Sequence, residues 1–87
     1  MAYKLKTSKV IDKFLDKRKD LAPKIIEKLE ILAKNPYENS LDIAKLIGYD
    51  KHYRLRIGKY RLLYEIIDEQ ILIYAYDIDS RGDIYKK

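Results

Sequence analysis

The sequence predicts an α+β domain, an antiparallel four-stranded sheet with an N-terminal helical hairpin packed on one face, in the order β-α-α-β-β-β. Three observations predict this fold. Residues 3–7 alternate between apolar and polar side chains, residues 8–34 carry apolar side chains at helical spacing, and residues 52–78 form extended stretches separated by two short turns. Because 87 residues leave room for one two-layer core, we expect residues 1–87 to form a single domain.

The composition excludes several kinds of site. Cysteine is absent and His52 is the only histidine, so the chain offers neither a disulfide framework nor a set of zinc ligands, and we expect no metal and no cofactor. No apolar run is long enough to span a membrane and the start lacks a secretory signal pattern, so we expect a soluble, cytoplasmic protein. The formal charge of +5 favours an anionic partner, either a nucleic acid or an acidic protein.

The first helix is predicted over residues 8–19. The hydroxyl of Thr7 or Ser8 can cap this helix, because it can accept a hydrogen bond from a free amide of the first turn. The apolar stripe of the helix consists of Val10, Ile11, Phe14 and Leu15.

A second helix is predicted to follow Asp20, which would cap its N-terminus. Pro23 would lie in the first turn, where amides lack helical partners anyway. It ends at Asn35-Pro36, because the residue before a proline disfavours the helical conformation. Its buried stripe consists of Ile25, Ile26, Leu29, Leu32 and Ala33. Only a few residues separate the two helices, so we expect them to form an antiparallel hairpin.

Residues 37–50 show no clear periodicity. We expect them to form a connecting loop with a turn at Gly48, pinned to the core by Leu41, Ile43, Leu46 and Ile47.

Residues 52–67 predict a β-hairpin. Gly58-Lys59 fits its two-residue turn, because glycine adopts the required backbone angles without steric cost. The turn would place Ile57 opposite Tyr60, Arg56 opposite Arg61 and Tyr53 opposite Tyr64. Two arginines directly across a strand pair repel each other, so we interpret this pair as part of a site for an anion such as phosphate.

Asp68-Glu69 predicts a second tight turn, followed by a strand over residues 71–78 whose nearly continuous apolar character indicates a central position. That turn would place Ile67 opposite Gln70, Leu63 opposite Tyr74 and Arg61 opposite Tyr76. The open face of the sheet would then carry Arg54, Arg56, Arg61, Tyr74 and Tyr76, edged by His52 opposite Glu65. Cations interleaved with aromatic rings suit a single-stranded nucleic acid, because cations bind its phosphates and rings stack on its bases.

Three segments resemble the RelE/ParE toxin superfamily: residues 45–48 (KLIG), residues 53–66 (YRLRIGKYRLLYEI) and residues 77–85 (DIDSRGDIY). The likeness extends over essentially the whole chain. It implies a toxin of a type II toxin–antitoxin system, with a cognate antitoxin as partner that wraps the helices and the basic face with an acidic or amphipathic segment.

The resemblance leaves three functional hypotheses. RelE-like members cleave messenger RNA in the ribosomal A site without a metal. In that reaction the RNA 2′-hydroxyl attacks the adjacent phosphate, giving a 2′,3′-cyclic phosphate and a 5′-hydroxyl. ParE-like members poison DNA gyrase instead. The third hypothesis is a catalytically silent antitoxin-binding module.

For the RelE-like hypothesis the resemblance also assigns roles to single residues. Arg61 would hold the scissile phosphate, and Arg81 would act on the same charge or at the leaving oxygen. Tyr85 would stack on a base or orient the 2′-hydroxyl, while Arg54 and Arg56 would bind phosphate or support the base.

The chain departs from the family pattern in its candidates for a general base. Many relatives have a histidine at the position of Ser80, and the guanidinium groups of Arg54 and Arg56 stay protonated, which makes them poor bases. The general base is therefore not identified by the sequence. The structural alternative for Arg61 and Arg81 is an ion pair with a nearby carboxylate of Glu65, Asp77 or Asp79.

Overall fold

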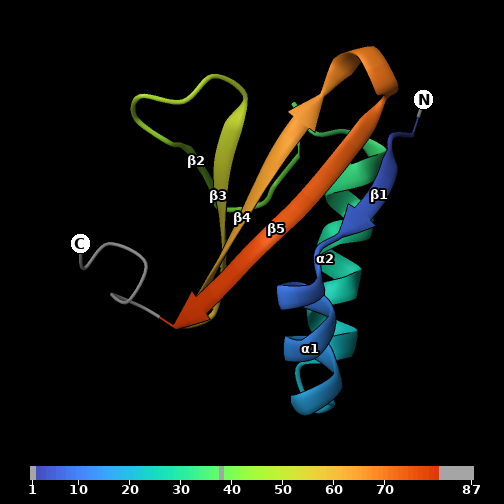
Figure 1. The fold of residues 1–87 in the computed structure, drawn as a ribbon, viewed down its shortest axis with the longest axis vertical. Coiled ribbons are helices and arrows are strands. Elements are labelled where there is room, and N and C mark those ends of the chain that lie inside the picture. Colours follow the sequence, from blue (N-terminus) through green and yellow to red (C-terminus); the bar gives the residue numbers. More distant parts are fainter. Residues whose placement is uncertain (1, 38, 81–87) are drawn as a thin grey trace.

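The computed structural model describes residues 2–37 and 39–80. Its elements, in chain order, are β1 (Lys4–Thr7), α1 (Lys9–Lys17), α2 (Ala22–Lys34), β2 (Ile43–Lys45), β3 (His52–Ile57), β4 (Tyr60–Ile67), the 3-10 helix η1 (Asp68–Gln70) and β5 (Leu72–Ser80). Figure 1 shows both helices beside β1 and β5, and the loop between β2 and β3 at the opposite edge of the sheet. Within the described ranges, no helix is long and apolar enough to cross a membrane.

The sheet has five strands in the order β1-β5-β4-β3-β2, so the prediction of four antiparallel strands was wrong in two respects. β1 pairs with β5 in parallel, which makes the sheet mixed. The additional strand, β2, lies in the segment predicted as a loop and pairs antiparallel with β3. Three residues are too few to show an alternating pattern, and no local pattern indicates which edge β1 joins. The central position predicted for the last strand is confirmed.

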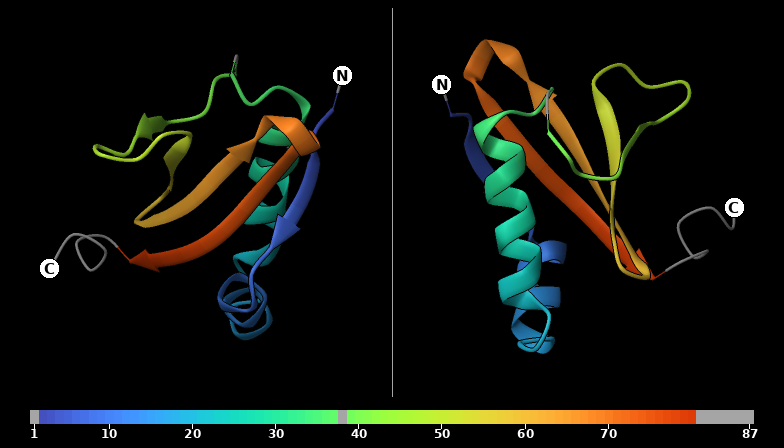
Figure 2. Two further views of the ribbon diagram at one scale, coloured as in Figure 1. Left: turned by 45° about the horizontal axis from the view of Figure 1, so that its top comes forward. Right: turned by 180° about the vertical axis from the view of Figure 1, so that it is seen from behind.

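The two helices cover one face of this sheet, as predicted (Figure 2). Ser8 caps α1, with its hydroxyl accepting from the amide of Ile11 at 3.4 Å. The prediction of Asp20 as the second cap was wrong, because α2 begins one residue later, at Ala22, behind Leu21. There the carbonyl of Arg18 accepts from two backbone amides in place of a side-chain cap.

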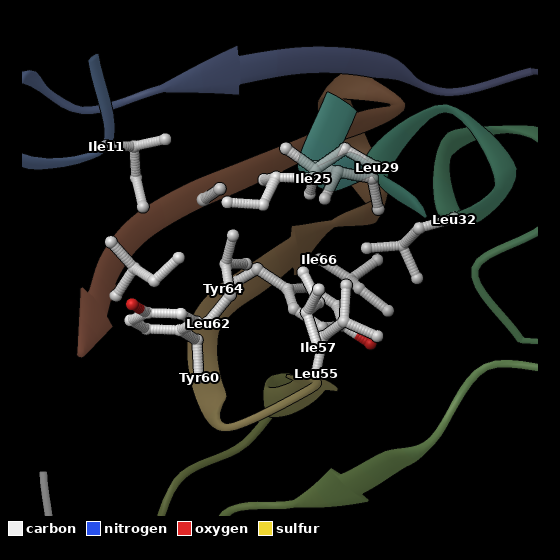
Figure 3. Close-up of a cluster of buried hydrophobic side chains, with 13 residues drawn as sticks. Ile11, Ile25, Leu29, Leu32, Leu55, Ile57, Tyr60, Leu62, Tyr64 and Ile66 are labelled. Carbon is white, nitrogen blue, oxygen red and sulfur yellow. The ribbon is translucent and has the colours of Figure 1, made fainter. Parts of the chain in front are cut away.

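The core lies between the helices and the covered face of the sheet. Figure 3 shows Ile11 of α1 and three side chains of α2 packed against the inward-facing residues of the strands. The α2 contribution consists of Ile25, Leu29 and Leu32, and that of β3 and β4 of Leu55, Ile57, Tyr60, Leu62, Tyr64 and Ile66. Val10 and Ile26, predicted in the buried stripes, are 50% and 42% exposed.

The β3–β4 hairpin has the predicted register. Ile57 lies opposite Tyr60 and Arg56 opposite Arg61. Gly58 has a φ angle of +59°, which glycine adopts without the steric cost that a Cβ brings. The guanidinium of Arg18 donates to the Tyr60 hydroxyl at 2.5 Å, which ties the tip of this hairpin to the end of α1.

The second turn differs from the prediction. Residues 68–71 connect β4 to β5 through η1, and pairing resumes between Ile67 and Leu72 rather than between Ile67 and Gln70. Ile71 closes the connection with a φ angle of +50°, which is unusual for a β-branched residue. No glycine in the sequence signals this left-handed position.

Asp68 joins four separate parts of the chain at this turn. Its carboxylate accepts from the hydroxyl of Tyr3 at 2.8 Å and from that of Tyr37 at 2.9 Å, and it lies 2.9 Å from the ammonium of Lys51. The hydrogen bond from Lys51, followed by those from the two tyrosines, lowers the pKa of Asp68. The charged form of the carboxylate is therefore the one that stabilises the fold.

We expect Asp68→Asn to reduce stability at pH 7 and to have a smaller effect at pH 3. A carboxylate with a lowered folded-state pKa contributes stability above its unfolded value of about 4, and this contribution is lost as the pH falls further. Urea unfolding at both pH values, with Asp16→Asn on the exposed face of α1 as the control, measures the difference. An equal effect of Asp68→Asn at pH 3 and pH 7 would contradict this assignment.

Candidate RNA-binding face

The face of the sheet that the helices leave open carries the polar candidates. Alternation along β3 and β4 turns every second side chain to this face, away from the core. Its members are His52, Arg54 and Arg56 from β3, Arg61, Leu63 and Glu65 from β4, and Tyr74, Tyr76, Asp77 and Asp79 from β5. The sequence therefore predicted the location of the face and most of its residues correctly.

The three described arginines of this face have different surroundings. Arg56 is exposed and pairs with Asp42 at 3.5 Å, a surface contact of the kind that contributes little stability. Arg54 is half-buried, and its Nε is buried without a hydrogen-bond partner among residues 2–37 and 39–80. Arg61 is half-buried and lies opposite Arg56 on one side and Asp79 on the other.

The longer turn and a β-bulge in β5 together explain why Arg61 does not face Tyr76 as predicted, because the turn shifts the pairing by two residues and the bulge by one more. Tyr64 pairs with Ala75, but Leu63 pairs with Asp77, so Tyr76 is the additional residue. Both Tyr76 and Asp77 consequently lie on the open face. The carboxylate of Asp77 accepts from the next backbone amide at 2.9 Å, which satisfies a donor beside the bulge.

The sequence contained a signal for this bulge. Strict alternation from the buried Ile73 and Ala75 would place Asp77 in the core, where an unpaired carboxylate is strongly unfavourable. One additional residue turns Asp77 outward and brings Ile78 into the core instead. The position of Asp77 in the alternation therefore indicates the irregularity.

An open pocket of about 820 Å³ adjoins the arginines. It lies between the loop after β2 and the open face of the sheet, and Arg54 and Leu63 form part of its wall. The remaining lining residues are Ala44, Lys45, Leu46, Ile47, Tyr49, His52 and Tyr76. The sequence did not predict this pocket, because half of its wall comes from residues 44–49, which have no periodic pattern.

His52 connects two strands within this pocket. Its Nδ1 lies 3.0 Å from the hydroxyl of Tyr76, and its Nε2 lies 3.7 Å from a carboxylate oxygen of Glu65. Burial, followed by the negative charges of Glu65 and Asp77, raises the pKa of Tyr76. The phenol therefore keeps its proton, which it can donate to Nδ1 when the ring proton is on Nε2, the nitrogen that faces Glu65. The predicted pairing of His52 with Glu65 is confirmed.

The face can bind anions, but its arginines cannot exchange protons. Guanidinium groups match the geometry of phosphate oxygens and stay charged at any physiological pH. The other two predicted site residues, Arg81 and Tyr85, lie outside the described residues.

Comparisons with known proteins agree with the resemblance in the sequence. The family model described as "ParE toxin of type II toxin-antitoxin system, parDE" matches residues 5–85. A protein of Methanocaldococcus jannaschii that is named as toxin RelE1 is 37% identical over 73 residues, which cover 78% of this chain and 81% of the relative.

Solved structures show the same fold. The RelE–RelB complex of the archaeon Pyrococcus horikoshii matches with a TM-score of 0.77 at 28% identity, covering 95% of this chain and 99% of that one. The isolated RelE toxin of E. coli matches with a TM-score of 0.75, covering 97% and 92%, and at 21% identity this likeness concerns the fold alone. With the family model covering nearly the whole sequence, the chain belongs to the ParE toxin family, and so to the RelE/ParE superfamily of toxins from type II toxin–antitoxin systems.

Proposed function

We propose that this toxin is a ribosome-dependent endoribonuclease that cleaves messenger RNA in the A site. One observation carries the proposal: Arg54, Arg56 and Arg61 lie on the uncovered face of the sheet, and Arg54 lines an open pocket with room for a nucleotide. Phosphate recognition by several guanidinium groups, with apolar and aromatic walls for a base, suits a single RNA strand. The 37% sequence identity to a protein named as toxin RelE1 supports the same conclusion.

The proposed reaction is attack of the RNA 2′-hydroxyl on the adjacent phosphate. Negative charge grows on the phosphate oxygens in the transition state, and a fixed cation that faces them lowers the barrier. We assign this role to Arg61, with Arg54 and Arg56 holding neighbouring phosphates. Guanidinium groups, rather than a metal ion, would supply the positive charge. By family resemblance, Arg81 would assist at the leaving oxygen and Tyr85 would stack on a base.

We also propose a cognate antitoxin as the partner that silences the toxin. The crystal structures from Pyrococcus horikoshii and Methanococcus jannaschii, both 28% identical to this chain, contain RelE with RelB. The helices here expose Val10, Ile26 and Ile31, which an amphipathic segment could cover. The arginines on the opposite face would attract acidic residues of the same antitoxin.

A second candidate function is poisoning of DNA gyrase. The specific observation in its favour is that the matching family model is that of ParE toxins. The two functions use different targets, so they can be separated by direct assays.

The test is a translation reaction stalled with a defined codon in the A site. Purified toxin is added, and primer extension maps any new 5′ end. We expect one cleavage within the A-site codon, and no cleavage of the same mRNA without ribosomes. A parallel assay measures trapping of gyrase on DNA. Intact mRNA together with trapped gyrase would refute the ribonuclease proposal and select the second candidate, whereas intact mRNA and free gyrase would indicate a silent binding module.

A further inference from the structure

The proposed cleavage requires a group that removes the proton from the attacking 2′-hydroxyl. The arginines of the open face cannot do so, because a guanidinium has no acceptor and does not lose its proton in proteins. Among residues 2–37 and 39–80, the candidates for the acceptor are the other side chains of the same face. The acceptor must also lie within reach of a phosphate held by Arg54 or Arg61.

Three side chains on that face form a chain of contacts that meets this requirement. The hydroxyl of Tyr76 lies 3.0 Å from Nδ1 of His52. On the other side of the ring, Nε2 lies 3.7 Å from Oε2 of Glu65. A carboxylate, an imidazole and a hydroxyl in this order allow a proton to pass from the hydroxyl to the ring while the carboxylate stabilises the resulting charge.

Tyr76 joins this arrangement from β5, at the β-bulge. His52 and Glu65 are cross-strand partners on β3 and β4, and β5 is the next strand of the sheet. Alternation from the buried Ala75 turns the side chain of Tyr76 to the open face, where its ring meets that of His52 edge-on, with centroids 5.6 Å apart. The ring of Tyr49 also lies beside the imidazole, with centroids 5.5 Å apart.

The chain of contacts opens to the same pocket as Arg54. His52, Tyr76 and Arg54 all line it. Leu63 separates them on the sheet, since it pairs with Arg54 on one side and with Asp77, next to Tyr76, on the other. Arg61 lies two residues further along β4, about 7 Å from Leu63. A nucleotide over Leu63 would therefore have cations at its phosphate and the Tyr76 hydroxyl at its other edge.

We propose that Glu65, His52 and Tyr76 form a proton relay that serves as the general base of the toxin, with Tyr76 as the residue that contacts the 2′-hydroxyl. This inference rests on the proposed ribonuclease function. A role in sheet packing alone would not need the hydroxyl of Tyr76, because the ring by itself fills its place between His52 and Tyr74.

The 2′-oxygen forms its bond to phosphorus while its proton passes to the Tyr76 oxygen, and the phenolic proton passes at the same time to Nδ1 of His52. The bond from phosphorus to the 5′-oxygen breaks, and this oxygen takes a proton from water. The imidazolium, held by Glu65, then releases its proton to the solvent. Because the raised pKa of Tyr76 disfavours a free phenolate, the two proton transfers are concerted.

The first test measures single-turnover cleavage on programmed ribosomes at saturating toxin. We expect Tyr76→Phe to lower the rate by on the order of 100-fold without changing the toxin concentration that gives half-maximal rate. The matched control is Tyr53→Phe, which removes the same atom from a ring packed against the core on the other face of the sheet. His52→Gln is expected to cause a similar loss and Glu65→Gln a smaller one.

The pH profile separates proton transfer from a structural role of His52. We expect the wild-type rate to fall on acidification, because a protonated imidazole cannot accept from Tyr76, and we expect His52→Gln to lose this acidic limb. The groups that face His52 are Glu65 on β4, Tyr76 and Asp77 on β5, Tyr49 in the loop, Lys45 on β2, and Arg54 on its own strand. An acidic limb that persists in His52→Gln would refute the role of the imidazole.

A substrate with sulfur in place of the leaving 5′-oxygen distinguishes a base from an acid. A thiolate leaves without a proton, so the loss in Tyr76→Phe should persist with this substrate if Tyr76 acts at the 2′-hydroxyl. Rescue by the sulfur substrate, or a rate for Tyr76→Phe within about threefold of wild type, would overturn the relay while the ribonuclease proposal stands. Intact RNA with the wild-type toxin would refute the ribonuclease proposal itself, and the relay with it.

Discussion

Arg61→Ala is expected to lower the single-turnover rate of mRNA cleavage on the ribosome by on the order of 100- to 1,000-fold. The guanidinium of Arg61 is half-buried on the open face, between Arg56 on β3 and Asp79 on β5. A fixed cation there requires no rearrangement when charge develops on the phosphate. Alanine removes the cation and leaves Asp79 beside the substrate, which adds repulsion to the loss of attraction.

The control for this variant is Lys59→Ala, at the exposed turn of the same hairpin. It changes the net charge equally but lies outside the open face. Rates are compared at saturating toxin, so that weaker binding to the ribosome does not appear as slower chemistry, and thermal unfolding confirms that both variants fold. Comparable losses in Arg61→Ala and Lys59→Ala would show that net charge matters and the position of Arg61 does not.

Leu62→Ala should lower the free energy of unfolding by about 2–5 kcal/mol while leaving the open face intact. Leu62 is the neighbour of Arg61 on β4, but alternation turns it into the core, where it is 0% exposed. It packs among the side chains from α1, α2 and the sheet that form the core cluster. Alanine removes buried apolar surface and leaves a cavity that the surrounding helices and strands can fill only in part.

Urea unfolding followed by circular dichroism measures this loss, and Leu5→Ala on β1 is the control. Leu5 is 38% exposed, so its truncation removes less buried surface and should cost clearly less. If the two substitutions had equal effects, the placement of Leu62 at the centre of the core would be wrong. Together, Arg61→Ala and Leu62→Ala separate the functional face of β4 from its structural face.

The features that the sequence predicted correctly depend on neighbours in the chain. The β3–β4 hairpin is local, since its turn and the alternation of its strands fix every partner from Tyr53 with Tyr64 to Ile57 with Tyr60. Ser8 as a cap and Asn35 as the end of α2 are local as well. For the same reason, the sequence alone assigns the arginines of β3 and β4 to one face of the sheet.

The features that the sequence missed depend on distant packing. The parallel pairing of β1 with β5 joins residues more than sixty positions apart, and β2 is a strand only because β3 offers it a free edge. The longer turn at residues 68–71 is held by Asp68, whose partners Tyr3, Tyr37 and Lys51 come from three other segments. No pattern within the turn itself indicates these contacts.

The sequence by itself determined the α+β class, the position of the helices, the family, and the arginine-bearing face of the central hairpin. Which residues lie beside those arginines was decided only by the tertiary structure. The longer turn shifts the pairing of β5 by two residues and the additional residue of the bulge shifts it by one more, so the partner of Arg61 is Asp79 rather than Tyr76. The bulge also turns Asp77 outward beside Tyr76, since the core accepts Ala75 and Ile78 and excludes the charge of Asp77.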